Sequence, residues 1–227
     1  MPSHNDIHHA YLDKKQEILN AAAYMSVWNA FKFIEKTTVF GKLDELRVYN
    51  ETFKTQERNS CSSLDSVTEH HMQLGNTMEK MKSCYNGIAD DLLLLAAFEH
   101  LMCFKLLTNG YVIHDFKKRR LVTDIDSRTQ KLPLDSLKTT AQVEHFKDST
   151  FNGSVLLMSD YISLLTSNES EVKGLNDLKD RRNKAHFDSK IYSFGVHNED
   201  FFAATRLILD SVSTEFSELF PMHVKAN

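Results

Sequence analysis

One stretch near the middle of the chain is apolar on almost every side. Residues Ile88 to Thr108 carry Leu, Ala, Phe or Met at most positions, and Asn-Gly pairs stand just before and just after them, at 86–87 and 109–110. Asn-Gly pairs favour turns and helix ends, so the pattern predicts one helix between two stops. A helix that is hydrophobic all round is buried on all sides. We therefore expect 88–108 to be the central helix of the domain.

The composition indicates an all-α fold. Only 7 glycines and 3 prolines occur among 227 residues, which is too few for a turn-rich β fold, and 41% of the residues are hydrophobic, which is enough for a sizeable core. The three cysteines show no disulfide pattern, and no leader or membrane-spanning stretch is recognisable. We therefore expect a cytoplasmic protein that does not interact with membranes.

Further helices follow from apolar residues at three- and four-residue steps. The pattern predicts helices over Asp6–Lys36, Lys42–Glu57, Leu64–Tyr85, 135–147, Ser154–Leu165, Leu175–Ala185 and Asn198–Phe220. A polar break is expected over Ser167–Gly174, and Ile191–Val196 is either a strand or a loop. We expect one helical-bundle domain, in which helices of residues 1–85 pack on a core formed by 86–220.

The stretch Leu178–Phe187 is the main chemical signal. Within one or two helical turns it gathers cations, an amide and a histidine: Arg181, Arg182, Asn183, Lys184 and His186. A guanidinium can hold a phosphate through two parallel hydrogen bonds, and an imidazole can move protons near neutral pH. The same cations would also stabilise an ordinary helix C-terminus. A net charge of −4 argues against a general nucleic-acid coat protein but leaves a local basic cleft open.

The run Asp180-Arg181-Arg182-Asn183-Lys184-Ala185-His186 resembles the Arg-x4-His signature of the HEPN superfamily, a group of helical domains that often act as metal-independent ribonucleases. The stretch Ile88–His114 is similar to the earlier core helix of many HEPN proteins and the turn after it, and the two stretches occur in the right order. The resemblance covers roughly residues 88–220. It implies a helical bundle of HEPN type with additional N-terminal helices.

The resemblance assigns roles to four residues. It implies that Arg181 and His186 are catalytic and that Arg182 and Asn183 support them or bind RNA. Arg182 replaces the Asn or Asp that usually follows the arginine. On a helix, His186 shares a face with Arg182 and Asn183, whereas Arg181 lies about 140° away. The choice of working arginine therefore stays open between Arg181 and Arg182.

The implied function is an endoribonuclease that cleaves RNA through 2′-hydroxyl attack, without a metal or another cofactor. HEPN nucleases are generally two-fold dimers with both motifs in a shared groove, so RNA and a second copy of the chain are the expected partners. Family members commonly act as toxins or anti-phage effectors, which implies an antitoxin or regulatory partner. Two alternatives stay open: a non-catalytic HEPN module that binds nucleotide or RNA, and a structural protein in which the cluster is only a helix end.

Overall fold

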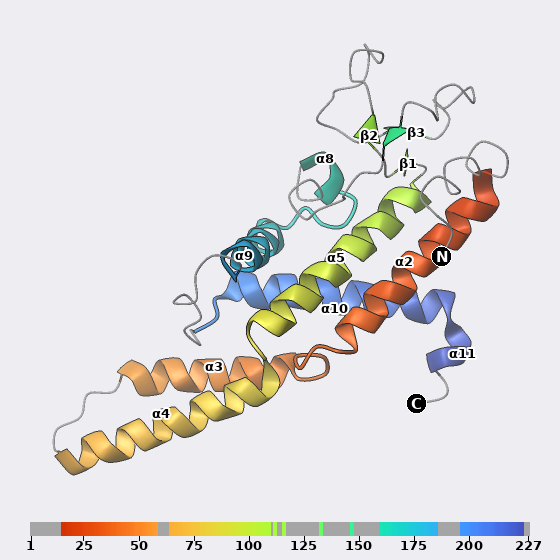
Figure 1. Cartoon of the computed structure of the whole chain (residues 1–227). Coiled ribbons are helices and arrows are strands. Elements are labelled where there is room, and N and C mark those ends of the chain that lie inside the picture. The colour runs from red at the N-terminus through yellow and green to blue at the C-terminus, as the bar shows by residue number, and fades with distance from the viewer. Residues whose placement is uncertain are drawn as a thin grey trace. The chain divides into compact units, whose positions relative to one another are not determined.

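The computed structural model describes residues 15–58, 64–109, 111–112, 115–116, 132–133, 146–147, 159–185 and 196–224. Helices dominate these residues (Figure 1): α2 (Lys15–Ile34), α3 (Leu43–Arg58), α4 (Leu64–Cys84), α5 (Ile88–Thr108), α8 (Ser159–Ile162), α9 (Glu169–Ala185), α10 (Glu199–Leu219) and α11 (Pro221–Val224). The strands have two residues each: β1 (Tyr111–Val112), β2 (Asp115–Phe116), β3 (Leu132–Pro133) and β4 (Phe146–Lys147). Strand β1 pairs antiparallel with β3, and β2 with β4. The all-α class is confirmed.

Helix α5 has the bounds that the sequence predicts. Gly87 adopts a φ of +50° immediately before the helix, a left-handed conformation that favours glycine. Leu94, Leu95, Phe98 and Leu101 are buried on the helix. The expected burial on all sides is wrong, however, because Leu92 is 40% exposed. Single exposed leucines are common, since a protein has too little polar surface to cover itself.

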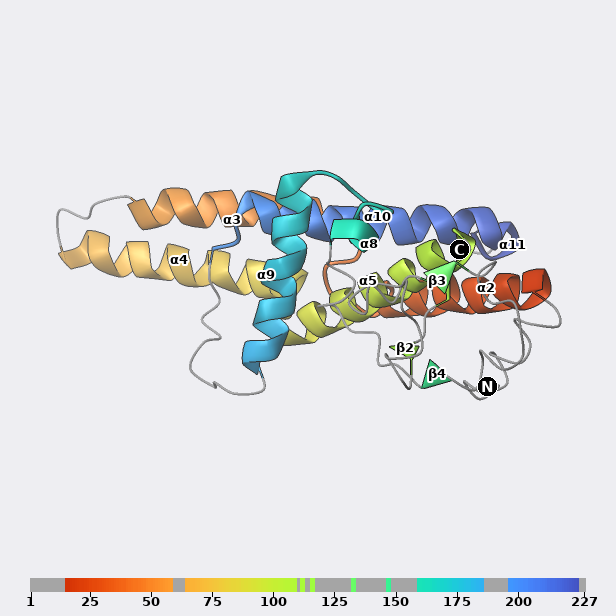
Figure 2. The same cartoon turned by 90° about the horizontal axis from the view of Figure 1, so that it is seen from above.

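Helix α9 begins earlier than the sequence predicts. The expected polar break over Ser167–Gly174 is confirmed only at Ser167 and Asn168, and it is wrong for Glu169–Gly174, which form the first turns of the helix. Asn168 caps this end, where its Oδ1 accepts a hydrogen bond from the backbone N of Ser170 at 2.9 Å. Gly174 is needed where α9 crosses α10 (Figure 2), since a Cβ there would lie 1.9 Å from the carbonyl oxygen of Asp200. Glycine therefore marks a close contact here and does not end the helix.

The remaining predictions fall partly outside the described residues. The first predicted helix is present from Lys15 onward, and the helix predicted from Ser154 is described only as α8. Most of the helix predicted over 135–147 lies outside the described residues, and its last two residues form strand β4 instead. The strand or loop predicted over 191–196 also lies outside them, apart from Val196. None of the described helices is long and apolar enough to cross a membrane.

The chain forms two compact units. The first comprises residues 1–30, 98–166 and 215–227, and the second comprises 31–97 and 167–214. In the first unit, the Trp28 ring packs against Phe216 and Phe220 with centroids 5.7 and 5.3 Å apart, and Lys105 pairs with Glu215. The division expected between residues 85 and 86 stays a prediction.

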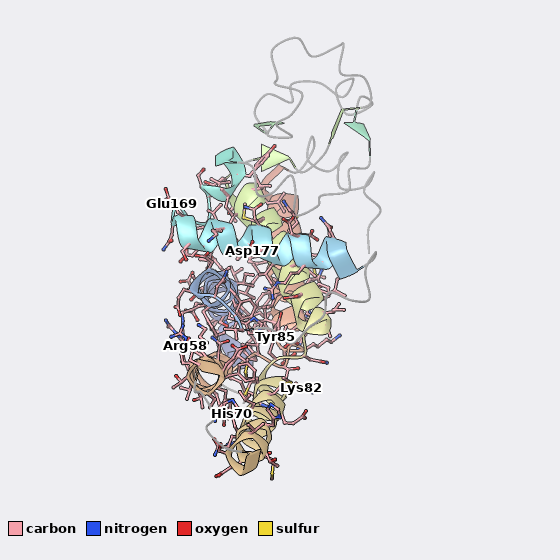
Figure 3. All side chains as sticks on the ribbon, turned by 90° about the vertical axis from the view of Figure 1, so that its left-hand side faces the viewer. Arg58, His70, Lys82, Tyr85, Glu169 and Asp177 are labelled. Atoms are coloured by element: carbon pink, nitrogen blue, oxygen red, sulfur yellow. The ribbon has the colours of Figure 1, made fainter. Side chains whose placement is uncertain are left out.

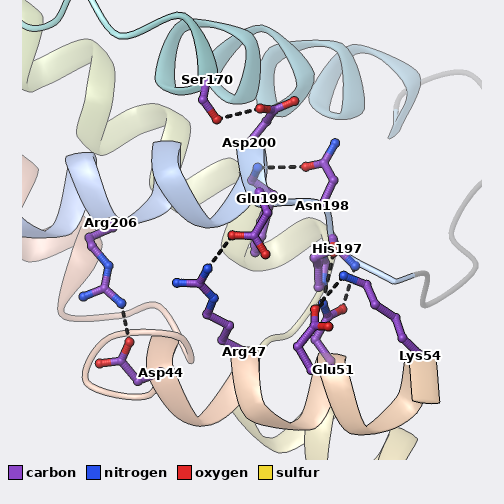
Figure 4. A network of polar contacts seen from close by, with 12 residues as sticks. Asp44, Arg47, Glu51, Lys54, Ser170, His197, Asn198, Glu199, Asp200 and Arg206 are labelled. Atoms are coloured by element: carbon purple, nitrogen blue, oxygen red, sulfur yellow. Dashed lines mark hydrogen bonds and ion pairs between the residues drawn. The ribbon is translucent and has the colours of Figure 1, made fainter. Parts of the chain in front are cut away.

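The second unit contains the α3–α4 hairpin, the start of α5, α9 and most of α10. Helices α3 and α4 run side by side and antiparallel (Figures 1 and 2). Ion pairs join α3 to α10, between Arg47 and Glu199 and between Asp44 and Arg206 (Figure 4). Asn198 caps α10, where its Oδ1 accepts a hydrogen bond from the backbone N of Phe201 at 2.8 Å. The two ion pairs thus connect α3 to α10, whereas the cap stabilises the start of α10.

Candidate functional site

Arg181 lies on α9 in the second unit and faces a buried carboxylate. Its Nη2 is 3.6 Å from Oδ1 of Asp91, whose side chain is 1% exposed, while 29% of the arginine side chain is exposed. Asp91 belongs to the first turn of α5, where the positive end of the helix dipole favours an acidic residue. A buried carboxylate is costly without a cation, so the pair fixes the guanidinium at this position.

Tyr85, labelled in Figure 3, directly follows α4 and contacts the same carboxylate. Its buried hydroxyl donates a hydrogen bond to Oδ1 of Asp91. Burial raises the pKa of Asp91, while the charge of Arg181 and the hydroxyl of Tyr85 act in the opposite direction. Burial, and then the charge of Asp91, raises the pKa of Tyr85 well above its usual value. Tyr85 therefore stays protonated and acts as a hydrogen-bond donor.

Aromatic rings orient the other side of Arg181. Its guanidinium carbon lies 4.8 Å from the ring centroid of Phe201, at the start of α10. The His197 ring stacks on Phe201, with centroids 4.1 Å apart and planes at 20°. The Tyr85 ring meets both of these rings edge-on, at 4.8 and 5.2 Å. Arg181 is thus held by a carboxylate and by an aromatic face.

His197 is a site residue that was not predicted from the sequence. The fully buried Asn50 of α3 fixes its backbone, because Asn50 Oδ1 accepts from His197 N at 2.8 Å and Asn50 Nδ2 donates to His197 O at 3.0 Å. Burial lowers the pKa of His197 to about 3, and the charges of Arg181 and Lys54 add to this effect. The imidazole is therefore neutral at neutral pH. No sequence signal marked His197, because it stands beside Arg181 only in the folded chain.

A hollow of about 250 Å³ opens next to Arg181. It is lined by residues of α9 and of the segment entering α10: Asp177, Asp180, Arg181, Val196, His197, Asn198 and Phe201. Asp180 is exposed and lies 3.7 Å from Nζ of Lys179. The lining therefore offers a guanidinium, two carboxylates and a neutral imidazole. Among the described side chains, no group of three or more His, Cys, Asp or Glu residues is placed to hold a metal ion.

The predicted site residues differ in whether they line the hollow. Arg181 lines the hollow, whereas Arg182 is half-buried and Asn183 is exposed, and neither of them is among the lining residues. His186 lies outside the described residues, so its placement beside Arg181 stays a prediction. Of these two arginines, Arg181 is the one that lines the hollow and pairs with Asp91.

The chain matches no protein-family model, and searches of curated proteins and of solved structures found no match. The likeness to the HEPN superfamily therefore rests on the Arg-x4-His run and the preceding core helix.

Proposed function

We propose that this protein is a metal-independent endoribonuclease of HEPN type. The observation that carries the proposal is the position of Arg181, whose guanidinium is fixed by Asp91 and Phe201 while 29% of its side chain stays exposed. A positive group that is oriented before the substrate arrives stabilises charge in a transition state without a reorganisation cost. Arg181 also stands five residues before His186, the spacing of the Arg-x4-His run.

The proposed reaction is an attack of a ribose 2′-oxygen on the adjacent phosphorus. The bond from phosphorus to the 5′-oxygen of the next nucleotide breaks, which leaves a 2′,3′-cyclic phosphate and a 5′-hydroxyl. His186 takes the proton of the 2′-hydroxyl or gives a proton to the leaving oxygen. Arg181 stabilises the charge that builds on the non-bridging phosphoryl oxygens. DNA is not a substrate because it lacks the 2′-hydroxyl.

The active form that we propose is a homodimer. A single His186 per chain supplies one proton-transfer group, whereas the reaction needs both a base and an acid. A two-fold interface between copies of the chain would bring two His186 and two Arg181 side chains into one groove. Size-exclusion chromatography with light scattering should then give twice the mass of 26.1 kDa.

The biological role that we propose is that of a cytoplasmic toxin or anti-phage effector. An unrestrained endoribonuclease damages the cell that makes it, so an antitoxin or regulatory partner would have to restrain it. Expression of the wild-type chain should arrest growth, and expression of His186→Ala should not. Equal growth with both proteins would contradict the role while leaving the chemistry to be tested in vitro.

The direct test of the chemistry is cleavage of single-stranded RNA by the purified full-length chain in EDTA. We expect the wild type to cut, and His186→Ala and Arg181→Ala each to lose activity by roughly 100-fold or more. Arg47→Ala is the matched control and should keep most of the activity, because Arg47 is an arginine of the same unit that does not line the hollow. Circular dichroism confirms that each variant is folded. Cleavage that survives His186→Ala would contradict the assignment.

A non-catalytic module that binds nucleotide or RNA is the second candidate. Asp91 offsets the charge of Arg181, and Asp177 and Asp180 line the same hollow, so the positive potential available to a phosphate is reduced. This candidate predicts that RNA or nucleotide binds without turnover and that Arg181→Glu abolishes the binding. Turnover in EDTA that depends on His186 would exclude it.

A further inference from the structure

Two polar side chains in the hollow beside Arg181 lack hydrogen-bond partners within the described part of the chain. The Asp177 carboxylate is half-buried on α9 and makes no hydrogen bond or ion pair there, although its charge acts on Lys173 one turn earlier. The imidazole nitrogens of His197 also make no hydrogen bond there, and they are not sealed from solvent. Both groups line the hollow with hydrogen-bonding capacity that the described side chains leave unused, so a ligand could bind them in place of water.

The chemistry of these groups narrows the class of ligand. An ionised carboxylate only accepts hydrogen bonds, so Asp177 selects an N–H or O–H donor and repels phosphate and carbonyl oxygens. Arg181 stands four residues further along the same face of α9 and is suited to a phosphate. A ligand that satisfies both residues carries N–H donors at one end and an anionic group at the other. A nucleotide has this combination.

The size of the hollow agrees with one nucleobase. A volume of about 250 Å³ lies below the roughly 300–1,000 Å³ of pockets that enclose drug-sized ligands. His197 supplies a neutral donor or acceptor to the same ligand, because its lowered pKa keeps the ring uncharged. A neutral imidazole adds no charge of its own beside the carboxylate of Asp177.

We infer that this hollow is a base-binding subsite that selects guanine in the RNA substrate. Guanine presents two adjacent donors, N1–H and the 2-amino group, and these match the two oxygens of one carboxylate. Adenine and cytosine offer one amino group beside a ring nitrogen that accepts hydrogen bonds. Uracil offers one N–H between two carbonyl oxygens. In both arrangements an acceptor atom of the base would face an oxygen of Asp177, which is unfavourable. The inference rests on the proposed function for its substrate class.

The test is calorimetric titration of the full-length chain with GMP, IMP, AMP and UMP. GMP should bind tightest, and IMP should bind about tenfold more weakly or worse, because it lacks the 2-amino group that donates to Asp177. Asp177→Asn should reduce the affinity for GMP by a similar factor. Asp210→Asn is the matched control, because Asp210 is an exposed carboxylate on α10 that does not line this hollow.

The result distinguishes the subsite from the nuclease. Equal affinities for GMP and IMP, an unchanged affinity in Asp177→Asn, or no binding of any mononucleotide would overturn the subsite. The GMP–IMP comparison uses the wild-type chain, so it does not depend on the folding of a variant. Mononucleotides contain no phosphodiester linkage, so their binding does not depend on cleavage. GMP binding without RNA cleavage would contradict the proposed nuclease activity and support the guanine-binding subsite. RNA cleavage without a preference for guanosine would contradict only the proposed guanine-binding subsite.

Discussion

Asp91 and Arg181 lie ninety residues apart in the sequence, yet Oδ1 of the carboxylate and Nη2 of the guanidinium are 3.6 Å apart in the second unit. The carboxylate is almost sealed from water, and the arginine is partly exposed at the hollow. The pair therefore contributes to the stability of the start of α5, and it also orients Arg181, the proposed phosphate-binding group. Substitutions at Arg181 should affect both.

Replacement of Arg181 by methionine should lower the free energy of unfolding by about 2 kcal/mol, because it leaves the buried Asp91 carboxylate without its cation. Arg47→Met is the matched control. Arg47 pairs with Glu199 through side chains that are 48% and 60% exposed, so its loss should cost less than about 1 kcal/mol. Urea unfolding at pH 7 measures both values. Equal costs for the two variants would show that Asp91 does not depend on Arg181.

A double-mutant cycle isolates the interaction. Asp91→Asn removes the charge that Arg181 neutralises, so Arg181→Met should cost less in the Asp91→Asn background than in the wild type, by about 1 kcal/mol or more. Unfolding in urea of the four proteins measures this coupling energy. Additive costs would mean that the 3.6 Å approach contributes nothing to stability.

The stability of the protein should depend on pH through His197. Because its pKa is lowered from 6.5 to about 3, the folded state binds fewer protons than the unfolded state between these values. Stability is therefore lost as the pH falls through this window, by up to about 1.4 kcal/mol per pH unit for one such group. His197→Phe keeps an aromatic ring against Phe201 and removes the titration. Unfolding between about pH 6 and pH 4 should thus be less pH-dependent in the variant, and parallel pH profiles would contradict the lowered pKa.

Substitution of two helical glycines by alanine should change the stability of the protein in opposite directions. At Gly174 a Cβ would lie 1.9 Å from a backbone oxygen of α10, so Gly174→Ala should destabilise the fold by about 2 kcal/mol or more. At Gly75 in α4 a Cβ would meet no atom within 4 Å, so Gly75→Ala should stabilise by roughly 0.5–1 kcal/mol. Thermal unfolding of the two variants and the wild type measures both changes in stability. A tolerated Gly174→Ala would contradict the close crossing of α9 and α10.

Local sequence signals predicted the helices whose ends carry their own stop residues. Helix α5 agrees at both ends, because Asn-Gly pairs flank a run that is mostly apolar. The start of α9 was placed too late, because the polar residues and Gly174 suggest a break when the chain is read alone. The reason for this glycine is the backbone of Asp200, which only the packing of α9 on α10 brings near. Tertiary contact therefore overrode the local preference.

The candidate site was predictable only in part. The Arg-x4-His run singled out Arg181, and the fold places this residue at the hollow. The partners that hold it, Asp91, Tyr85 and Phe201, come from three separate parts of the chain and have no mutual spacing in the sequence. His197 was missed for the same reason, since its environment is created by Asn50 and Phe201.

The nature of the RNA ends tests the central proposal most directly. The full-length protein is incubated in EDTA with an oligoribonucleotide, and the products are analysed by mass spectrometry beside those from His186→Ala. Attack by the 2′-hydroxyl predicts fragments with a 2′,3′-cyclic phosphate and a 5′-hydroxyl, formed by the wild type and not by the variant. Fragments with a 5′-phosphate, cleavage of a 2′-O-methyl RNA, or the same products from His186→Ala would contradict the proposed reaction.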